Sequence, residues 1–369
     1  MSARADNEAL RVLMVGPSPP PLGGVTVLFD SLVRGLRQRN DVDLTMVDTG
    51  GVRGRGALGL LALRRLSSSV RRAALGADVV TLHAATSGLH VTGPLAASAA
   101  SSAGKPLIVR KFGGTDLMEY GAARRVPILR ALRRASLYLA ETRALVEAGR
   151  REGLNAEWYP NSRAMPPLPP TRAPEPCTRF VYLGQIHSRK GIRELMAAGE
   201  QLIGDASVDV YGTLDFDVSE REFVGLSRVR YMGPVEPADV HGVLSGYDAL
   251  VLPSYHEGEG YPGVVLEAYA AGLPVVSTRW RAIPELVEDQ VTGLLVAPGD
   301  AAHLKVAMLT LVDDASLCVR LREGVRAKRE EFSDAVWQER FVEHCRAVVR
   351  AARDEGDERR EDGGRVGGQ

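Results

Sequence analysis

Short apolar runs and helical patterns alternate along this chain in two separate series. In the first series, strands are expected at 11–15, 42–47, 79–82 and 107–110, with helices at 25–38, 58–75 and 124–135. In the second series, strands are expected at 180–183, 208–211, 229–232, 249–252 and 275–277. Buried strands that alternate with helices form parallel sheets covered on both faces. The chain is therefore predicted to form two doubly wound α/β domains.

A proline-rich segment separates the two series. It reads AMPPLPPTRAPEP at 164–176, and proline can continue neither a helix nor the hydrogen-bonded ladder of a sheet. We place a linker there, between an N-terminal domain at 1–163 and a C-terminal domain at 177–333. The 369 residues agree with this division, because domains usually have about 100 to 200 residues.

The end of the chain carries one more helical pattern. Residues 334–352 read as an amphipathic helix with Trp337, Phe341, Cys345 and Val348 recurring on one face. The charged, glycine-rich residues 353–369 offer little to bury, so they are expected to be disordered.

Composition limits the class of protein. Hydrophobic residues make up 45% and charged residues 25%, as in soluble globular proteins. No apolar run approaches the ~20 residues of a membrane-spanning helix and the N-terminus shows no signal-peptide pattern, so we expect a cytoplasmic protein. Cys177, Cys318 and Cys345 are too widely spaced for a disulfide framework or a metal site, and we interpret them as packing residues.

Positive charge is concentrated in the first half of the chain. The net charge is zero, but residues 1–165 carry 23 Lys and Arg against 13 Asp and Glu. An anionic membrane at the inner face or a phosphate-bearing acceptor would explain this basic half, and so would ordinary solvated charge. The basic stretches Arg64-Arg65, Arg71-Arg72 and 124–134 interleave with the apolar residues Leu60, Leu61, Leu63, Ile128 and Leu132. Such helices either rest on anionic lipid or pack on the sheet with basic outer faces. No nucleic-acid partner is expected.

The most informative segment is PSYHEGEGYPGVVLEAYAAGLPVVST, residues 253–278. It follows an expected strand, so its glycine-rich loop lies where open α/β sheets bind ligands. A helix is expected to begin near Gly263, where the amides of Gly263, Val264 and Val265 would face an anion. Glu259 and Glu267 flank this point. Each carboxylate could accept hydrogen bonds from a sugar or ribose diol, or could equally be a solvated or paired surface group.

Two other segments combine a strand, a polar loop and a helix. YLGQIHSRKGIREL at 182–195 places Arg189 and Lys190 just before a helix, where a cation could neutralise a leaving diphosphate. GPSPPPLGG at 16–24 contains Gly23 and Gly24, which let the backbone approach a ligand closely. Asp48 is the only hint of a dinucleotide fingerprint, so a nicotinamide dehydrogenase is a less favoured alternative.

These segments resemble those of retaining glycosyltransferase family four. Glu259 and Glu267 match the E-x7-E motif of that family, and GEGYPGVVLEA, GLPVVST, IPELV and TGLLV are typical of it. The resemblance runs from about residue 11 to residue 341. It implies the GT-B fold, in which two Rossmann-like parallel-sheet domains enclose a cleft. It also implies transfer of a hexose from a nucleotide-diphosphate sugar to a hydroxyl acceptor.

The resemblance assigns roles to individual residues. Glu259 would bind hydroxyls of the donor sugar, Glu267 the ribose and Lys190 the diphosphate, and the final helix would pack on the N-terminal domain. Glu259 and Lys190 are the implied catalytic residues. The implied donor-binding residues are Gly23, Gly24, His83, Gln185, Arg189, Gly233, Gly260, Tyr261, Pro262, Gly263, Val264, Val265 and Glu267.

The chain departs from the family pattern at two positions. Gln185 follows the strand-end glycine where the family often has an arginine, which leaves Lys190 and Arg189 to carry the charge. Gly113 in KFGGTDL stands where the family commonly has a histidine. His83 is a candidate substitute, although a lone histidine at a strand end is more often structural.

Other activities fit parts of the pattern. Paired carboxylates serve glycoside hydrolysis, but there they oppose each other across a bond, whereas Glu259 and Glu267 lie on one segment. Asp215-Phe216-Asp217 has the form of a metal site in the other common transferase fold, and we interpret it as a turn. We expect no metal and no cofactor, since the nucleotide sugar is a substrate. A nucleotide-sugar 2-epimerase and a non-catalytic donor-binding scaffold subunit are the alternatives.

Overall fold

The chain divides into two compact units. The computed structural model describes residues 8–21, 23–50, 57–169 and 175–365. The first unit comprises Met1–Pro160 and Ala335–Gln369, and the second comprises Asn161–Asp334. The predicted linker at 164–176 therefore belongs to the second unit, and its residues 170–174 lie outside the described part. The unit begins before the predicted boundary because Arg163 N donates a hydrogen bond to Phe332 O, which ties this segment to the second unit.

The first unit contains a parallel sheet of six strands in the order β2-β1-β3-β4-β5-β6. The strands are β1 Leu10–Gly16, β2 Val42–Asp48, β3 Val79–Ala85, β4 Leu107–Phe112, β5 Leu137–Ala140 and β6 Ala156–Trp158. Alternate side chains point to opposite faces, so Leu13 and Val15 enter one hydrophobic cluster while Val12 and Met14 enter another. Both faces of this sheet are buried, as predicted.

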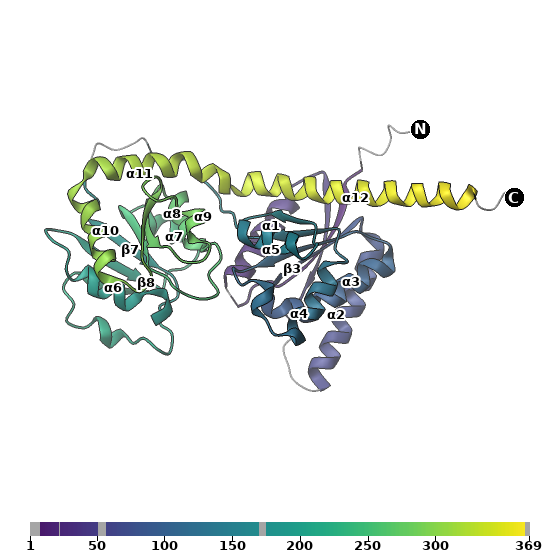
Figure 1. The fold of residues 1–369 in the computed structure, drawn as a ribbon, viewed down its shortest axis with the longest axis horizontal. Helices are drawn as coiled ribbons and strands as arrows, with labels where there is room; N and C mark the ends of the chain where they lie inside the picture. Colours follow the sequence, from purple (N-terminus) through teal and green to yellow (C-terminus); the bar gives the residue numbers. More distant parts are fainter. Residues whose placement is uncertain (1–7, 22, 51–56, 170–174, 366–369) are drawn as a thin grey trace. The chain divides into compact units, whose positions relative to one another are not determined.

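Helices cover the two faces of this sheet (Figure 1). One cluster is built with α2, α3, α4 and α5, and the other with α1 and α12. The helices are α1 Gly24–Arg37, α2 Ala57–Gly76, α3 Thr86–Ala103, α4 Ala122–Leu132, α5 Arg143–Arg151 and α12 Asp334–Arg365, with a 3-10 turn, η1, at Leu117–Glu119.

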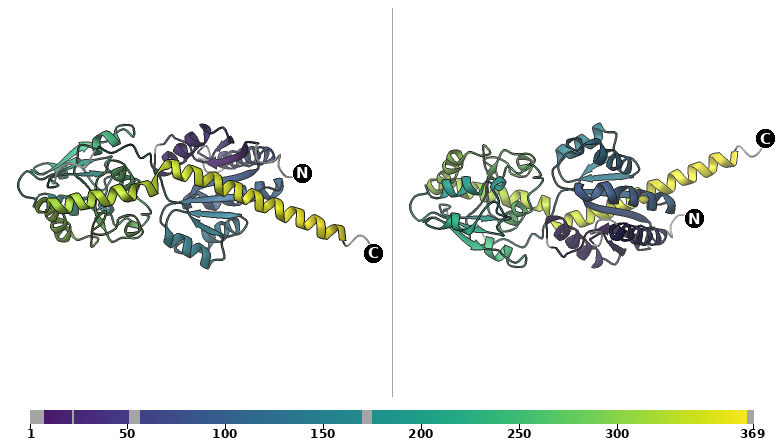
Figure 2. Two further views of the ribbon diagram at one scale, coloured as in Figure 1. Left: turned by 90° about the horizontal axis from the view of Figure 1, so that it is seen from above. Right: turned by 90° about the horizontal axis from the view of Figure 1, so that it is seen from below.

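The last helix, α12, packs on the first unit. Trp337, Phe341, Cys345 and Val348 all lie in the cluster on the α1 side of the sheet, which confirms the face predicted from their spacing. The helix continues to Arg365, however, so the predicted end at 352 is wrong, and so is the predicted disorder of residues 353–365. Residues 366–369 of the predicted disordered tail lie outside the described residues. In Figure 2 the C-terminal end of α12 extends beyond the rest of this unit. The prediction read poor burial as disorder, whereas Ala, Arg, Asp and Glu can continue a helix that is exposed to solvent.

The second unit repeats the architecture. Its parallel sheet has the order β12-β11-β10-β7-β8-β9. The strands are β7 Arg179–Leu183, β8 Ser207–Tyr211, β9 Val229–Gly233, β10 Ala249–Leu252, β11 Val275–Thr278 and β12 Gly293–Val296. The helices are α6 Ile192–Gly199, α7 Val240–Leu244, α8 Gly263–Ala270, α9 Ile283–Leu286, α10 Ala301–Asp313 and α11 Ala315–Lys328, with 3-10 turns η2 Ser188–Lys190, η3 Glu220–Phe223 and η4 Arg329–Phe332.

The strand order brings two chain segments together at one edge of the second sheet. β7 and β10 are adjacent and parallel, with Phe180 opposite Ala249. The strand order reverses between them, and open α/β sheets bind ligands at this switch point, beyond the carboxyl ends of the strands. The loops that follow β7 and β10 therefore start side by side, as the candidate site requires. The three cysteines are buried and free, which confirms their interpretation as packing residues.

Candidate functional site

Lys190 and Glu259 meet where the two loops converge. Lys190 Nζ donates a hydrogen bond to Glu259 Oε2 at 2.6 Å, and the two side chains are only 19% and 8% exposed. Ser254 Oγ donates to the same carboxylate oxygen at 2.5 Å. A cation and an anion that are removed from water compensate each other's burial. The structure thus brings together the two residues predicted to be catalytic.

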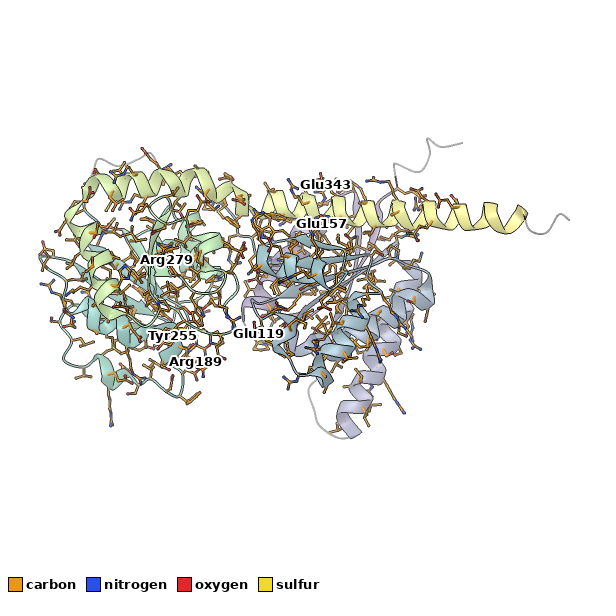
Figure 3. The ribbon with its side chains drawn as sticks, viewed as in Figure 1. Glu119, Glu157, Arg189, Tyr255, Arg279 and Glu343 are labelled. Carbon is orange, nitrogen blue, oxygen red and sulfur yellow. The ribbon has the colours of Figure 1, made fainter. Side chains whose placement is uncertain are left out.

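Gly191 allows the two loops to approach this closely. Its φ of +73° lies in the left-handed region, and a Cβ at this position would lie 2.1 Å from Pro253 O. Any other residue would push the loop after β7 away from the loop after β10. Tyr255 N also donates a hydrogen bond to Arg189 O at 2.9 Å, which joins the backbones of the two loops. Both residues are labelled in Figure 3.

The loop after β10 is held from the next strand as well. Thr278 Oγ1 donates to Ser254 O, and Trp280 Nε1 donates to His256 O at 2.8 Å. Tyr261 is 3% exposed, and its hydroxyl donates to Glu285 Oε2 at 2.8 Å. These bonds pre-organise the segment that carries Glu259, and pre-organised polar groups are the basis of electrostatic catalysis.

Several of the predicted donor-binding residues in this loop are buried or hydrogen-bonded within the protein. Gly260, Tyr261 and Pro262 are buried, and their roles in donor binding stay predictions. The amide of Val265 is also engaged, since it donates to Pro262 O at 3.0 Å. Gly263 and Val264, at the start of α8, are partly exposed and keep their predicted position.

Glu267 lies in α8 and is paired with an arginine that the motif analysis did not single out. Arg163 Nε donates to Glu267 Oε1 at 3.0 Å, and the two side chains are 17% and 25% exposed. Helical side chains tilt toward the N-terminus, so the Glu267 carboxylate points back along the first turn of α8. The carboxylate therefore lies toward the N-terminal end of α8, which directly follows the loop carrying Glu259.

Three other predicted donor-binding residues of the second unit have different surroundings. Gln185 Nε2 donates to Asp215 Oδ2 at 3.0 Å. Arg189 forms an exposed ion pair with Glu257, so it is the solvent-exposed member of the basic pair. Gly233 ends β9 with a φ of +82°. Their roles in donor binding stay predictions.

The Asp215-Phe216-Asp217 segment is a turn, as predicted. Asp217 Oδ2 accepts hydrogen bonds from Ser188 N at 3.0 Å and Ser188 Oγ at 2.5 Å. These bonds and the Gln185–Asp215 bond anchor the loop that ends in Lys190. Throughout the described residues, no group of three or more His, Cys, Asp or Glu side chains is arranged to hold a metal ion.

Two histidines that sequence reasoning missed lie beside the pair. The rings of His187 and His256 are 5.4 Å apart between centroids and nearly perpendicular. Partial burial, and then the charge of Lys190, lower the pKa of each imidazole. Each histidine precedes a predicted catalytic residue by three positions, and this spacing is the only signal in the sequence that could have pointed to them.

In the first unit, the prediction for His83 is wrong. Its ring is fully buried among Phe29, Phe112 and Phe341, and burial lowers its pKa well below the usual value. A neutral ring inside the core cannot contact a donor from solvent. The sequence placed His83 at the end of a strand, but it did not show that helices cover this residue.

The other first-unit positions lie at the carboxyl edge of its sheet. Gly23 precedes α1 and Gly24 is its first residue. Gly113, with a φ of +89°, is braced from both sides: Lys111 Nζ donates to Gly113 O at 2.8 Å, and Gly113 N donates to Glu141 Oε2 at 2.9 Å. Lys111 and Glu141 are buried and were not predicted as site residues.

Comparison with known proteins identifies the region that carries the Lys190–Glu259 pair. Residues 177–314 match the family of glycosyl transferases group 1. This stretch contains Lys190, Glu259 and Glu267, together with all six strands of the second sheet. The candidate site of the second unit therefore lies in the part of the chain that resembles group 1 transferases.

Relatives and solved structures extend this finding. Glycogen synthase of Mycobacterium tuberculosis is 29% identical over 195 residues, which cover 51% of this chain and 44% of that protein. D-inositol 3-phosphate glycosyltransferase of Corynebacterium efficiens is 33% identical over 138 residues, covering 37% and 32%. The chain thus spans less than half the length of these relatives. HepE of Anabaena, solved in complex with UDP, has a TM-score of 0.73 at 19% identity and covers 92% of this chain and all of its own. The chain has the GT-B fold, with two Rossmann-like parallel-sheet domains.

Proposed function

We propose that this protein is a retaining glycosyltransferase that moves a hexose from a UDP- or GDP-linked donor to a hydroxyl acceptor. The acceptor would be a glycan, a lipid-linked molecule or a natural product. The Lys190–Glu259 pair carries the proposal, because it places a partly buried cation and a carboxylate at the ligand-binding edge of a Rossmann-like sheet. HepE structures that hold UDP or UDP-glucose support a nucleotide-sugar donor.

The proposed reaction needs no protein nucleophile. The bond between the anomeric carbon and the diphosphate oxygen breaks, and the acceptor oxygen bonds to the same face of that carbon. The acceptor proton passes to the leaving diphosphate. Lys190 would stabilise the charge that develops on the diphosphate, while Glu259 would orient the sugar through its hydroxyls.

Donor binding can be tested without knowing the acceptor. We expect one UDP- or GDP-linked sugar from a panel to raise the melting temperature, since a ligand at 100 times its Kd stabilises the folded state by about 2.7 kcal/mol. Product analysis of that mixture should show transfer or slow hydrolysis. An epimerised sugar would identify the 2-epimerase alternative, and an intact donor after long incubation with acceptors would identify a binding scaffold. Either result would contradict the proposal.

We also propose a peripheral contact with anionic membrane, made by the first unit. Helix α2 contains four arginines and no acidic residue. Leu58, Leu60 and Leu61 in its first turns are 76%, 65% and 46% exposed. At about 100° per residue, the side chains opposite the buried face of α2 mix arginine with leucine. They are Leu58, Leu61, Arg64, Arg65, Ser68, Ser69, Arg71, Arg72 and Leu75.

Anionic lipid suits this outer face of α2 better than a second copy of the chain. Basic helices with exposed leucines bind lipid through buried apolar area and attraction to anionic headgroups. Two copies that met through this face would oppose arginine with arginine. Ile128 and Leu132 of α4 are buried in the core. The prediction that these two residues contribute to a lipid-facing surface is therefore wrong. No helix within the described residues is long and apolar enough to span a bilayer.

A further inference from the structure

Arg163 has a fixed backbone at the edge of the second unit. Its N donates to Phe332 O at 3.0 Å, and its O accepts from Asp334 N at 2.8 Å. Ser162 Oγ donates to Asp334 Oδ1 at 2.6 Å. The segment around Arg163 is therefore bonded to the segment around Ser333, and the arginine side chain extends from a rigid point.

The side chain of Arg163 lies across the start of α8. Besides the bond from Nε to Glu267, Nη1 donates to Ser162 O at 2.9 Å, which fixes the plane of the guanidinium. A Cβ on Gly263 would lie 2.4 Å from Arg163 Nη2, so the guanidinium lies directly against the first residue of the helix and a larger residue there would displace it. The neighbouring Asn161 Nδ2 donates to Tyr261 O at 3.1 Å and binds the same segment to the loop that carries Glu259.

A cation at this position is electrostatically unusual. The N-terminus of a helix carries partial positive charge and attracts anions, so a guanidinium there opposes the helix dipole. Glu267 compensates part of this charge. The arrangement is unfavourable for α8 alone, and it is stabilised by the bond between the guanidinium and the Glu267 carboxylate.

We propose that Arg163 is a positioning residue for the nucleotide. It holds the Glu267 carboxylate in the orientation that meets the ribose of a nucleoside diphosphate. This inference rests on the proposed function, because the ribose contact of Glu267 belongs to that function. A purely structural role would be different. If Arg163 only stabilised α8, its removal would lower the stability of the unit and leave the nucleotide affinity unchanged.

Calorimetry with UDP and GDP tests the proposal. We expect Arg163→Met to weaken binding of the preferred nucleotide at least about 10-fold, since Glu267 is then no longer held in the orientation that accepts hydrogen bonds from the ribose. Arg163→Lys should recover part of the affinity, because lysine restores the positive charge but not the planar guanidinium with its several donors. The double variant Arg163→Met with Glu267→Gln should bind no more weakly than Glu267→Gln alone, because Arg163 acts through Glu267. The matched control is Arg11→Met, which removes an arginine from an ion pair with Asp78 in the first unit and should bind like the parent.

The outcomes separate this inference from the function on which it rests. If the parent binds UDP or GDP and Arg163→Met binds equally well with only a lower melting temperature, Arg163 is a structural brace. Additive losses in the double variant would also overturn the inference, because they would show that Arg163 acts independently of Glu267. If the folded parent binds no nucleoside diphosphate, the proposed function itself fails.

Discussion

Glu259 and Glu267 have different partners within the second unit. Glu259 accepts hydrogen bonds from Lys190 and Ser254 in the loop region. Glu267, which lies on α8, accepts a hydrogen bond from Arg163. The two carboxylates therefore have separate surroundings, although one motif contains both. This separation agrees with contacts to different parts of a donor, the transferred sugar for Glu259 and the ribose for Glu267.

Substitution of each carboxylate should have a distinct effect. Glu267→Ala should weaken the binding of a free nucleoside diphosphate as well as that of the intact donor. A lost hydrogen bond of ~1.5 to 3 kcal/mol lowers the affinity by roughly 10- to 150-fold. Glu259→Ala should leave nucleoside diphosphate affinity nearly unchanged and reduce turnover. Calorimetry and a rate assay measure the two effects.

Stability needs a control in this comparison. Removing one partner of a buried ion pair can cost about 3 to 5 kcal/mol, so Glu259→Ala threatens the fold by leaving Lys190 unpaired. Glu259→Gln keeps the shape of the side chain and serves as the matched variant. The assignment is wrong if the Glu259 variants, rather than Glu267→Ala, lose nucleotide affinity.

The sequence could predict which candidate residues lie close together, but not which of them are buried in the core. Lys190 and Glu259 follow strands of one parallel sheet, so their approach could be expected from the strand-loop-helix pattern. His83 also follows a strand-end pattern, but the rings of Phe29 and Phe341 that enclose it come from distant segments. Arg163 could not be found because its position depends on a backbone bond to Phe332.

At the scale of an element, α2 makes the sharpest prediction. The triple variant Leu58→Ser, Leu60→Ser and Leu61→Ser should bind anionic vesicles at least about 10-fold more weakly, since burying each leucine contributes up to ~1.5 to 3 kcal/mol. Cosedimentation with vesicles of phosphatidylglycerol and phosphatidylcholine, at low and high salt, measures this binding.

A single exposed residue of the second unit provides the control for α2. Ile203 is 52% exposed, and Ile203→Ser should sediment like the parent. The parent should bind more weakly at high salt, because the arginines of α2 would contribute electrostatically. A parent that does not sediment at low salt, or a triple variant that sediments like the parent, contradicts a membrane contact through α2.

Elements with one buried face were predictable, and elements buried on several sides were not. Helix α1 shows a clear apolar stripe and begins within one residue of its expected start. Helix α3 contacts both α2 and α4, so it has no polar stripe, and Pro94 interrupts its pattern further. Strand β6 has only three residues, too few for a periodic signal.

At the scale of the whole molecule, the proposed chemistry depends on one charged group rather than on a metal. In the proposed reaction, Lys190 lies where the charge of the leaving diphosphate develops. We therefore expect turnover to continue in the presence of a chelator. The sequence predicted two Rossmann-like sheets correctly, because alternation of strands and helices is a local property. It did not predict that α12 continues to Arg365.

The central claim is that Lys190, in the matched region of the second unit, drives departure of a nucleoside diphosphate from a nucleotide sugar. Its most direct test is the rate at which the parent and Lys190→Met release nucleoside diphosphate from the stabilising donor, measured in chelator. We predict steady release by the parent and a rate lower by about 10² to 10³ for a folded Lys190→Met, as for other lost electrostatic donors. Equal rates for both proteins, or release by the parent only after magnesium or manganese is added, would contradict the account.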